Sequence, residues 1–191
     1  MDAKKICVFC SSSDAIDPIF YNHAKLLGME IAKRSMDLIF GGSNVGLMRE
    51  VTEAVIAGGG KVIGVIPTFI KEKKGIVDGM TEVIETQNMF DRKQKMIELS
   101  DTFIMLPGGI GTLDEALDVI VLKQFGQVKG PIIFINTNGY YEPFRQVLLN
   151  MVEHKFLKPF DDNYILFTDN IDGIWDYIEA YEFKFPGDKW F

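Results

Sequence analysis

The sequence predicts an α/β protein: one doubly wound domain spanning residues 1–191, with a mostly parallel sheet of about six or seven strands and helices on both faces. Three observations predict it. Short runs rich in branched apolar residues alternate with longer segments of helical periodicity. The strand-like runs are apolar almost throughout, which is typical of parallel strands buried on both faces. Polar or glycine-rich loops follow several of these runs, as ligand-binding loops do in such sheets.

The predicted strands are short runs in which Val, Ile and Phe dominate and turn residues mark the ends. Because helical segments separate them, neighbouring strands are expected to run parallel. In chain order the strands are Lys5–Cys10, Asp37–Phe40, Lys61–Ile66, Glu82–Glu85, Thr102–Leu106, Pro131–Ile135 and Tyr164–Phe167.

Helical periodicity fills the segments between the strands, at about 18–34, 46–57, 89–100, 112–125, 141–154 and 171–182. Gly58 to Gly60 ends the second of these helices, and Asn88, with Asp91 three residues later, is a suitable N-terminal cap for the third. The helix after residue 112 has apolar residues at helical spacing that we expect to be buried, namely Leu113, Ala116, Leu117, Ile120 and Val121.

Length, composition and charge restrict the possible functions. A chain of 191 residues with 47% hydrophobic and 25% charged residues is ordinary for one globular domain. No apolar run approaches the roughly 20 residues of a membrane span, and the first residues carry no signal-peptide pattern, so we expect a cytoplasmic protein. The net charge of −7 argues against a nucleic acid polymer as partner, although a single phosphate group needs only local amides and one or two cations.

The cysteine and histidine residues do not predict a metal or a disulfide. Cys7 and Cys10 have CxxC spacing, but they lie in one predicted strand, where residues three apart point to opposite faces. Two reduced, buried thiols are therefore the expected state. His23 and His154 are isolated in the sequence, so we expect neither a metal nor a cofactor.

The loops that follow the strands predict where a ligand binds. Ligands of doubly wound sheets bind outside the carboxyl ends of the strands, and four loops of suitable composition lie there. The loop 41–46 is neither a phosphate-binding P-loop nor a dinucleotide fingerprint, so a tight turn and a ligand contact remain equally open for it. The four loops are Ser11–Ser13, 41–46, Pro67–Thr68 and 107–112.

The segment 107–115, with the sequence PGGIGTLDE, is the most informative in the chain. It follows a predicted strand and opens a helix, and its glycines allow the backbone to approach a ligand closely. Free amides at a helix start and the positive end of its dipole favour a phosphate. Glu115 follows one turn later. A phosphate cradle beside a carboxylate predicts an active site for a small phosphorylated molecule.

Glu115 has two interpretations of about equal weight from spacing alone. Thr112 and Glu115 fit a capping box, in which the glutamate bonds back to the first turn of its helix. Alternatively, Glu115 lies about 200° around the helix from Leu113 and faces a cleft at the sheet edge. Arg92 is either part of a solvated charged face or, if its helix lies beside the 107–112 loop, a partner of this site.

Three segments together resemble the LOG (LONELY GUY) family of cytokinin riboside 5′-monophosphate phosphoribohydrolases, long mislabelled as lysine decarboxylases. The family signature PGGxGTxxE is matched in full by residues 107–115. Its arginine–lysine helix motif is matched by Arg92 and Lys93, and its GGxxxGLM turn by residues 41–48. The similarity extends from about residue 8 to residue 141, and chance agreement at three ordered motifs is negligible.

The resemblance implies a Rossmann-like homodimer that hydrolyses the N-glycosidic bond of adenosine 5′-monophosphates, releasing the base and ribose 5-phosphate. It assigns catalysis to Arg92 and Glu115. A carboxylate stabilises or covalently captures the oxocarbenium-like sugar of such a reaction, and we expect Arg92 to keep Glu115 ionised by lowering its pKa. The resemblance assigns phosphate binding to Gly108, Gly109, Gly111 and Thr112. The other expected substrate contacts are Lys93, Met89, Gly42, Ser43 and Ser12.

The chain departs from plant-like members of the family at positions we expect near the base. Phe90 stands where those proteins have His, Val121-Leu122 replaces a Thr-Trp pair, and the acidic residue after the third strand has no clean counterpart at 72–74. The resemblance therefore implies retained catalysis and leaves open whether the base is prenylated adenine.

Two other functions compete with cytokinin release. One is a general AMP nucleosidase, and the other is a non-catalytic nucleotide-binding or cofactor-carrier protein on the same scaffold. A pyridoxal-phosphate decarboxylase is disfavoured, because no lysine stands beside the phosphate loop. The aromatic segment 183–191 is expected to pack on its own domain or on a second subunit.

Overall fold

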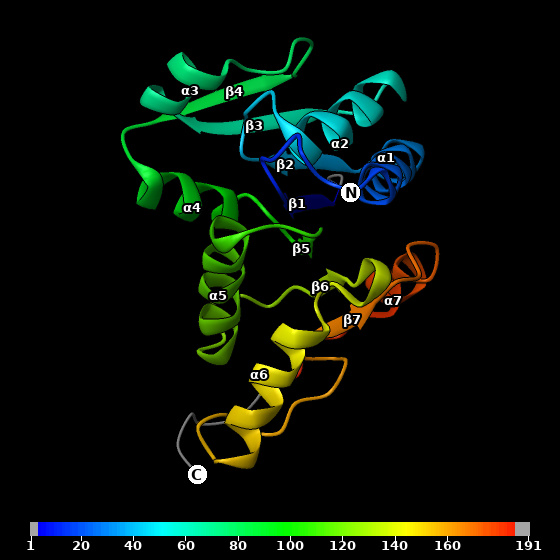
Figure 1. Cartoon of the computed structure of the whole chain (residues 1–191), viewed down its shortest axis with the longest axis vertical. Coiled ribbons are helices and arrows are strands. Elements are labelled where there is room, and N and C mark those ends of the chain that lie inside the picture. The colour runs from blue at the N-terminus through cyan, green and yellow to red at the C-terminus, as the bar shows by residue number, and fades with distance from the viewer. Residues whose placement is uncertain (1–3, 186–191) are drawn as a thin grey trace.

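The fold is a seven-stranded sheet in the order β4-β3-β2-β1-β5-β6-β7, with every neighbouring pair parallel (Figure 1). The computed structural model describes residues 4–185, so Trp190 and Phe191 of the aromatic tail lie outside the described residues. The strands are β1 (Lys5–Phe9), β2 (Asp37–Phe40), β3 (Val62–Pro67), β4 (Glu82–Thr86), β5 (Thr102–Met105), β6 (Ile132–Ile135) and β7 (Leu166–Thr168).

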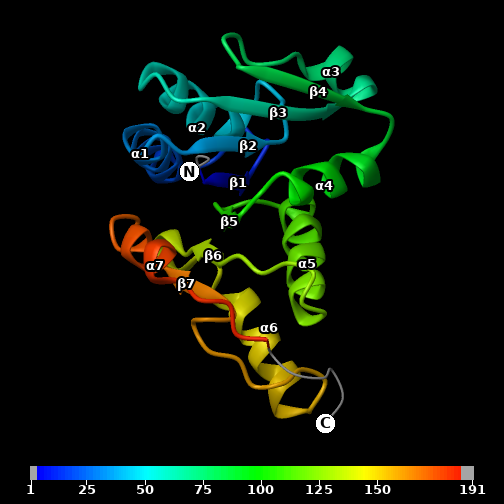
Figure 2. The same cartoon turned by 180° about the vertical axis from the view of Figure 1, so that it is seen from behind.

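Helices cover both faces of the sheet, and the two cores are separated by the strands (Figures 1 and 2). The α-helices are α1 (Pro18–Lys33), α2 (Gly46–Ala57), α3 (Thr68–Lys74), α4 (Met89–Glu98), α5 (Ile110–Gln124), α6 (Glu142–Glu153) and α7 (Ile174–Ala180). The helices α1, α2 and α7 pack on one face, and α4, α5 and α6 pack on the other. The predicted doubly wound α/β fold is confirmed.

Strand β1 shows how the alternation of side chains builds these two cores. Ile6, Val8 and Cys10 enter the core under α1 and α2, whereas Cys7 and Phe9 enter the core under α4 and α5. The two cysteines thus face opposite sides of the sheet, and both are free and buried, as their spacing predicts.

The order of the strands reverses at β1, which pairs with β2 on one side and β5 on the other. Cys7, for example, pairs with Ile39 of β2 and with Phe103 of β5. Helices that follow β1 and β5 therefore leave the sheet in opposite directions, and a crevice opens between their loops. The switch point brings Ser11 and Pro107, 96 residues apart, within backbone hydrogen-bonding distance.

Three local features differ from the sequence prediction. The sequence indicated no helix at 68–74, where the structure has α3. Because α3 buries no residue, its sequence has no apolar periodicity that could predict it. Helix α5 begins at Ile110, two residues before the predicted start. On α5, Leu117 and Val121 are 42% and 46% exposed, so the prediction that both are buried is wrong for the single chain. The apolar stripe on α5 is wider than the face that contacts the sheet.

Candidate active site

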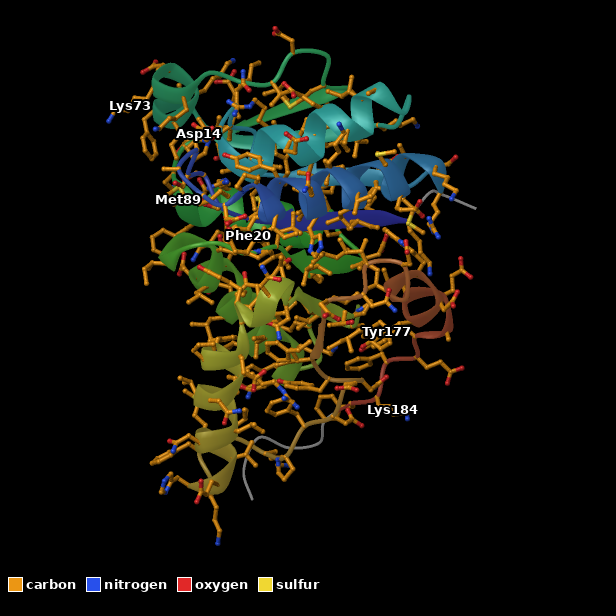
Figure 3. All side chains as sticks on the ribbon, turned by 45° about the vertical axis from the view of Figure 1, so that its right-hand side comes forward. Asp14, Phe20, Lys73, Met89, Tyr177 and Lys184 are labelled. Atoms are coloured by element: carbon orange, nitrogen blue, oxygen red, sulfur yellow. The ribbon has the colours of Figure 1, made fainter. Side chains whose placement is uncertain are left out.

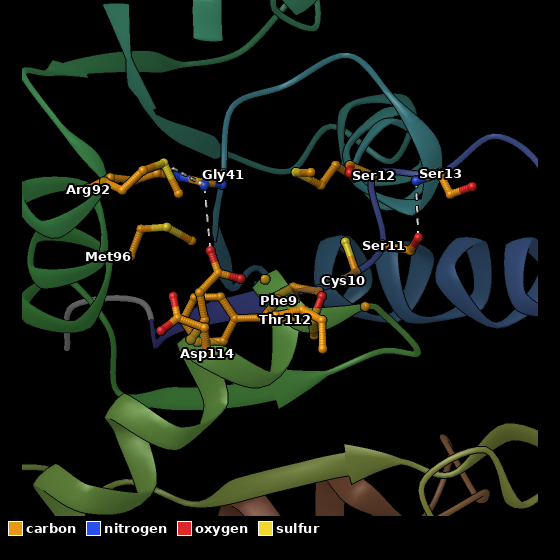
Figure 4. A pocket seen from close by; sticks show the side chains of 17 residues that line it. Phe9, Cys10, Ser11, Ser12, Ser13, Gly41, Arg92, Met96, Thr112 and Asp114 are labelled. Carbon is orange, nitrogen blue, oxygen red and sulfur yellow. Dashed lines mark hydrogen bonds and ion pairs between the residues drawn. The ribbon is translucent and has the colours of Figure 1, made fainter. Parts of the chain in front are cut away.

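A cavity of about 350 Å³ lies at the switch point, within the range of small-molecule sites (Figure 4). Its walls are the loops after β1 and β5, Gly41 at the end of β2, the inner face of α4 and the first turns of α5. Figure 3 shows Asp14, in the loop after β1, and Met89 on one side of the molecule and Lys184 on the other. Loops that are distant in sequence therefore meet at one edge, as expected for a doubly wound sheet.

The start of α5 forms the floor of the cavity and carries no side-chain cap. Its N-cap residue is Gly109, which has no side chain to bond the first amides. The amides of Ile110, Gly111 and Thr112 have no carbonyl one turn earlier in the helix, and all three residues line the cavity. Free amides at a helix start favour an anion.

This geometry removes the capping interpretation of Glu115. Thr112 is the third residue of α5 and Glu115 the sixth, so neither occupies the position that a capping box requires. Glu115 instead lines the cavity with a residual exposure of 8%. The alternative that placed its carboxylate in the cleft is confirmed.

The three glycines of the segment 107–115 are required for different structural reasons. None of Gly108, Gly109 and Gly111 has the positive φ that favours glycine. A Cβ at Gly108 would lie 2.1 Å from the Thr112 hydroxyl, so this glycine is needed for packing, and Gly108 does not line the cavity. A Cβ at Gly109 or Gly111 would meet nothing within 4 Å and would project into the cavity region that both residues line. Close approach of a ligand is the remaining reason for glycine at those two positions.

Backbone and tyrosine contacts hold the loop between β5 and α5 in place. The Ser11 amide donates to the Pro107 carbonyl at 3.1 Å, which joins the loops after β1 and β5. From the segment before α6, the Tyr140 hydroxyl donates to the Gly108 carbonyl at 2.8 Å, and the Tyr141 hydroxyl donates to the Leu106 carbonyl at 2.7 Å. These bonds occupy carbonyl groups of the loop that an anion would otherwise meet.

Arg92 of α4 faces Glu115 of α5 across the cavity. The distance from Arg92 Nη1 to Glu115 Oε1 is 3.6 Å, and both side chains are about nine-tenths buried (Figure 4). Arg92 Nε also donates to the Val65 carbonyl at 3.2 Å. A Cβ on Gly41 would lie 1.7 Å from Arg92 Nη2, so the absence of a side chain at Gly41 makes room for the guanidinium.

Burial dominates the charge state of Glu115. Desolvation raises the pKa of this carboxyl from 4.5 to about 7, although the Arg92 charge acts in the opposite direction. Asp114 raises the pKa further, and Lys93 lowers it. The expected effect of Arg92 is therefore present, but the net direction is upward, because the carboxylate loses more hydration than one guanidinium at 3.6 Å restores.

The remaining predicted contacts divide into two groups. Met89 and Ser12 line the cavity. Gly42 and Ser43 do not, because Gly42 makes a left-handed turn (φ 77°) against Ile66 and the buried Ser43 bridges to Ile76. The tight-turn interpretation thus fits most of the loop 41–46, and only Gly41 of that loop reaches the cavity. Pro67 and Thr68 open α3 and lie outside the lining.

Lys93 and the residues that depart from plant-like relatives also lie outside the cavity. Lys93 Nζ contacts Asp114 and Asp118 instead of the cavity. Phe90 is 78% exposed, and Val121 lies on the outer face of α5. In a single chain, none of these side chains lines the space where we expected the base.

Sequence reasoning missed several residues of the site. Gly41 was grouped with its loop, and its specific role depends on the path of Arg92, which no local pattern encodes. Asp114, inside the motif, lines the cavity. Tyr140 and Tyr141 follow the predicted strand at 131–135, so the rule that ligand loops follow strands contained the signal that would have found them.

The described residues show two further features that bear on the class of site. No three His, Cys, Asp or Glu side chains among residues 4–185 lie close enough together to hold a metal ion. No helix within the same residues is long and apolar enough to cross a membrane. The polar groups at the cavity include a guanidinium, two carboxylates, hydroxyls and helix-start amides.

The fold and site define an α/β protein with an uncapped helix start beside a buried carboxylate–guanidinium pair. The family model described as "Possible lysine decarboxylase" matches residues 48–178. A cytokinin riboside 5′-monophosphate phosphoribohydrolase of Arabidopsis thaliana is 37% identical over 182 residues, which are 95% of this chain and 84% of that protein. A probable enzyme of the same name from Oryza sativa subsp. japonica is 41% identical over 156 residues, with 82% of this chain and 69% of that protein covered. The chain belongs to this family, the LOG family.

Solved structures share the fold at lower sequence identity. The molybdenum cofactor carrier protein of Chlamydomonas reinhardtii superposes with a TM-score of 0.73 at 20% identity, covering 94% of this chain and 98% of that one. The molybdenum cofactor binding protein of Rippkaea orientalis gives 0.70 at 21% identity, with the same coverage. At these identities the likeness concerns the fold alone.

Proposed function

We propose that this protein hydrolyses the N-glycosidic bond of an N6-substituted adenosine 5′-monophosphate and releases a cytokinin-type base and ribose 5-phosphate. The observation that carries the proposal is the buried Arg92–Glu115 pair within one cavity with the uncapped start of α5. The names of the relatives at 37% and 41% identity support the same reaction.

In this proposal the phosphate binds at the start of α5 and the ribose lies beside Glu115; the uncapped first turn of α5 and the position of Glu115 in the same cavity support this arrangement. Cleavage breaks the C1′–N bond, and its electron pair leaves with the base. The Glu115 carboxylate stabilises the positive charge that develops on the sugar, in the manner of glycosidase carboxylates. Water then supplies a hydroxyl group to C1′ and a proton to the base. The amides bind the phosphate at a point remote from the reacting bond, and this binding positions the C1′–N bond next to the catalytic groups.

A raised pKa of Glu115 fits this reaction in one specific way. At pH 7 the carboxyl of the free protein is divided between its two forms, because its pKa is about 7. The ionised form is the one that stabilises an oxocarbenium ion. Poor hydration in the ground state makes that carboxylate a stronger partner for the charge that develops in the transition state.

The first experiment measures base release from AMP and from isopentenyladenosine monophosphate, with Glu115→Gln as the matched variant. We expect wild type to release base and folded Glu115→Gln to lose at least about 1,000-fold in rate. A higher rate with the prenylated nucleotide supports cytokinin release, and a higher rate with AMP supports a general nucleosidase. If wild type cleaves neither nucleotide while AMP raises its melting temperature, the protein is a nucleotide carrier and the proposal is wrong.

Lysine decarboxylation is disfavoured by the position of the lysines. A pyridoxal-phosphate enzyme needs an unpaired lysine beside its phosphate site. Lys93 is the lysine adjacent to Arg92, and its amino group is engaged by Asp114 and Asp118. No lysine is among the residues that line the cavity within the described chain.

We propose that the protein is a homodimer that associates through the outer face of α5 and α6. Leu117, Val121 and Met151 are 39–46% exposed there and line a groove of about 720 Å³. Phe156, at the same groove, is 85% exposed. Exposed apolar area of this kind is typical of protein interfaces. Sizing chromatography with light scattering should give a dimer mass for wild type and a monomer mass for Val121→Lys; a monomeric wild type would contradict the proposal.

We propose further that residues 1–191 fold as one domain and that the protein is cytoplasmic. Both cores use the same sheet, which supports a single domain. We expect one cooperative thermal transition and recovery of the native protein in the cytosolic fraction; two separate transitions or a membrane-bound pool would contradict these statements.

A further inference from the structure

Lys93 is a buried cation that the proposed reaction does not use. Its amino group lies 2.9 Å from Asp114 Oδ2 and 2.6 Å from Asp118 Oδ2, and the residue is 8% exposed. It is the neighbour of Arg92 on α4, and Asp114 is the neighbour of Glu115 on α5. Two adjacent sets of ion pairs therefore join the same two helices: Arg92 with Glu115, and Lys93 with Asp114 and Asp118.

The two aspartates form a like-charge pair that needs a counter-ion. Asp114 and Asp118 are four residues apart on α5, so their side chains lie on one face of the helix and repel each other. Lys93 bridges them. Burial lowers the pKa of Lys93, but the hydrogen bonds and charges of Asp118 and Asp114 outweigh that effect, so the pKa is raised and the charged form is favoured. Asp114 and Asp118 engage two of the three N–H donors of Lys93, and Lys93 does not line the cavity.

The charges of this cluster act on Glu115. The charged groups that act on its carboxyl are Arg92 and Lys93 from α4 and Asp114 and Asp118 from its own helix. Burial is the largest cause of the raised pKa of the Cys7 and Cys10 thiols, and the Glu115 carboxylate in turn raises it further. After burial and Arg92, the two aspartates raise the pKa of Glu115 and Lys93 lowers it. Without Lys93, two uncompensated negative charges would stand next to a carboxyl that is already difficult to ionise.

We propose that Lys93 is a positioning residue that neutralises Asp114 and Asp118, so that Glu115 retains the charge needed for glycosidic cleavage and Arg92 remains opposite it. The inference rests on the proposed function for its kinetic consequence, but its electrostatic content is independent of any substrate. It replaces the expectation that Lys93 touches the nucleotide.

The test compares pH profiles of base release for wild type, Lys93→Met, Asp118→Asn and the triple variant Lys93→Met/Asp114→Asn/Asp118→Asn. Loss of the cation should move the acid limb of kcat upward by about one pH unit, and loss of one aspartate should move it downward. The triple variant, which removes one positive and two negative charges, should have its acid limb at or below that of wild type. Lys93→Arg should behave like wild type. The substrate phosphate titrates in the same way in every profile, so a shift of the acid limb between variants reflects a titrating group of the protein.

Three results would overturn the proposal. A Lys93→Met variant with a higher KM and an unmoved acid limb would indicate direct substrate contact. Loss of thermal stability in Lys93→Met without any shift of the limb would indicate a purely structural bridge. A triple variant whose limb stays as high as that of Lys93→Met would exclude charge compensation.

A second readout separates this inference from the proposed function. The carboxyl of Glu115 can be titrated by NMR in protein labelled with ¹³C-glutamate, with Glu115→Gln providing the assignment. The titration midpoint should rise in Lys93→Met and return in the triple variant even if wild type cleaves no nucleotide. An unchanged midpoint in Lys93→Met would refute the electrostatic role, whereas inactivity of wild type with shifting midpoints would refute only the reaction.

Discussion

Helices α4 and α5 begin at the same edge of the sheet, but the backbone amides of their first turns differ in whether a side chain accepts their hydrogen bonds. At the start of α4, the Asn88 side chain accepts hydrogen bonds from the Phe90 and Asp91 amides at 2.9 and 3.0 Å. At the start of α5, Gly109 offers no side chain, and the first amides face the cavity. Helix α4 caps its first amides with its own side chain, whereas the first amides of α5 have no side-chain cap and are available to a ligand.

The comparison shows why a capped start and a functional start require different sequences. A side-chain cap contributes about 1 kcal/mol of stability and occupies the amides that an anion would use. α5 lacks this contribution and carries a buried carboxylate as well, and α4 supplies the guanidinium that faces it. The helix start without a side-chain cap is the one at which we propose that the phosphate binds.

The largest effect is expected from placing a methyl group at the open start of α5. Gly111→Ala projects a Cβ into the cavity region without meeting the protein, so the phosphate is excluded while the fold is kept. We expect kcat/KM to fall about 100- to 1,000-fold, and the melting temperature to stay constant or rise, because Ala favours helix over Gly. The measurement is base release together with thermal unfolding in inorganic phosphate.

Phosphate should raise the melting temperature of wild type and leave that of Gly111→Ala unchanged. Gly109→Ser, which supplies a cap like that of α4, should be more stable than wild type and equally insensitive to phosphate. A Gly111→Ala protein that phosphate still stabilises would mean that the start of α5 is not the anion site.

The next effect concerns the fit of Arg92 against Gly41. In Gly41→Ala the new methyl group displaces the guanidinium, whose Nη2 would otherwise lie 1.7 Å away. We expect about a 10- to 100-fold loss of kcat, caused by misplacement of the α4 cation opposite Glu115. The measurement is a double-mutant cycle with Arg92→Ala. Since both changes remove the same interaction, Gly41→Ala should cost little more in the Arg92→Ala background; full additivity would show that Gly41 acts elsewhere.

A stability effect is expected from the buried carboxylate on α5. The pKa of Glu115 in the folded protein, about 7, exceeds its ordinary value of 4.5. The folded state therefore binds this proton more tightly, and the associated stability is fully present below about pH 4.5 and is lost as the pH rises through 7. Relative to Glu115→Gln, wild type should lose about 2 to 3 kcal/mol between pH 5 and pH 8.5.

Urea unfolding of both proteins across this pH range measures the difference. The Gln variant removes the titration and keeps the shape, so other titrating groups cancel in the comparison. Parallel stability curves for the two proteins would show that Glu115 titrates near its ordinary pKa.

The smallest effect is expected at the capped start of α4. Asn88→Ala removes two hydrogen bonds to first-turn amides, and the unfolding free energy should fall by about 1 kcal/mol. The effect of phosphate on the melting temperature should be the same as in wild type, because this end of α4 does not hold the anion. Asn88→Asp, which keeps an accepting oxygen, is the matched control and should retain most of the stability. A loss of phosphate stabilisation in Asn88→Ala would contradict the assigned difference between the two helix starts.

The sequence by itself determined the fold class and the edge of the sheet that carries the site. These follow from local regularities: strand–helix alternation, loops at strand ends, and the glycine-rich turn before α5. Opposite faces for Cys7 and Cys10 follow from the same period-2 geometry. Family resemblance, carried by residues 107–115, then specified the chemistry that composition could not.

The tertiary structure decided the roles that depend on what meets a side chain from elsewhere in the chain. Whether Glu115 caps its helix or faces the cavity depended on a two-residue difference in where α5 begins. Its raised pKa depends on burial, which a nearby arginine does not reveal. Lys93 was expected to contact the substrate, but in the structure it bridges two carboxylates that lie 21 and 25 positions later in the sequence. Periodicity predicts on which face of its own helix or strand a residue lies. The charge state and the contacts of that residue depend on the other element packed against this face, and this packing is fixed only when the chain folds.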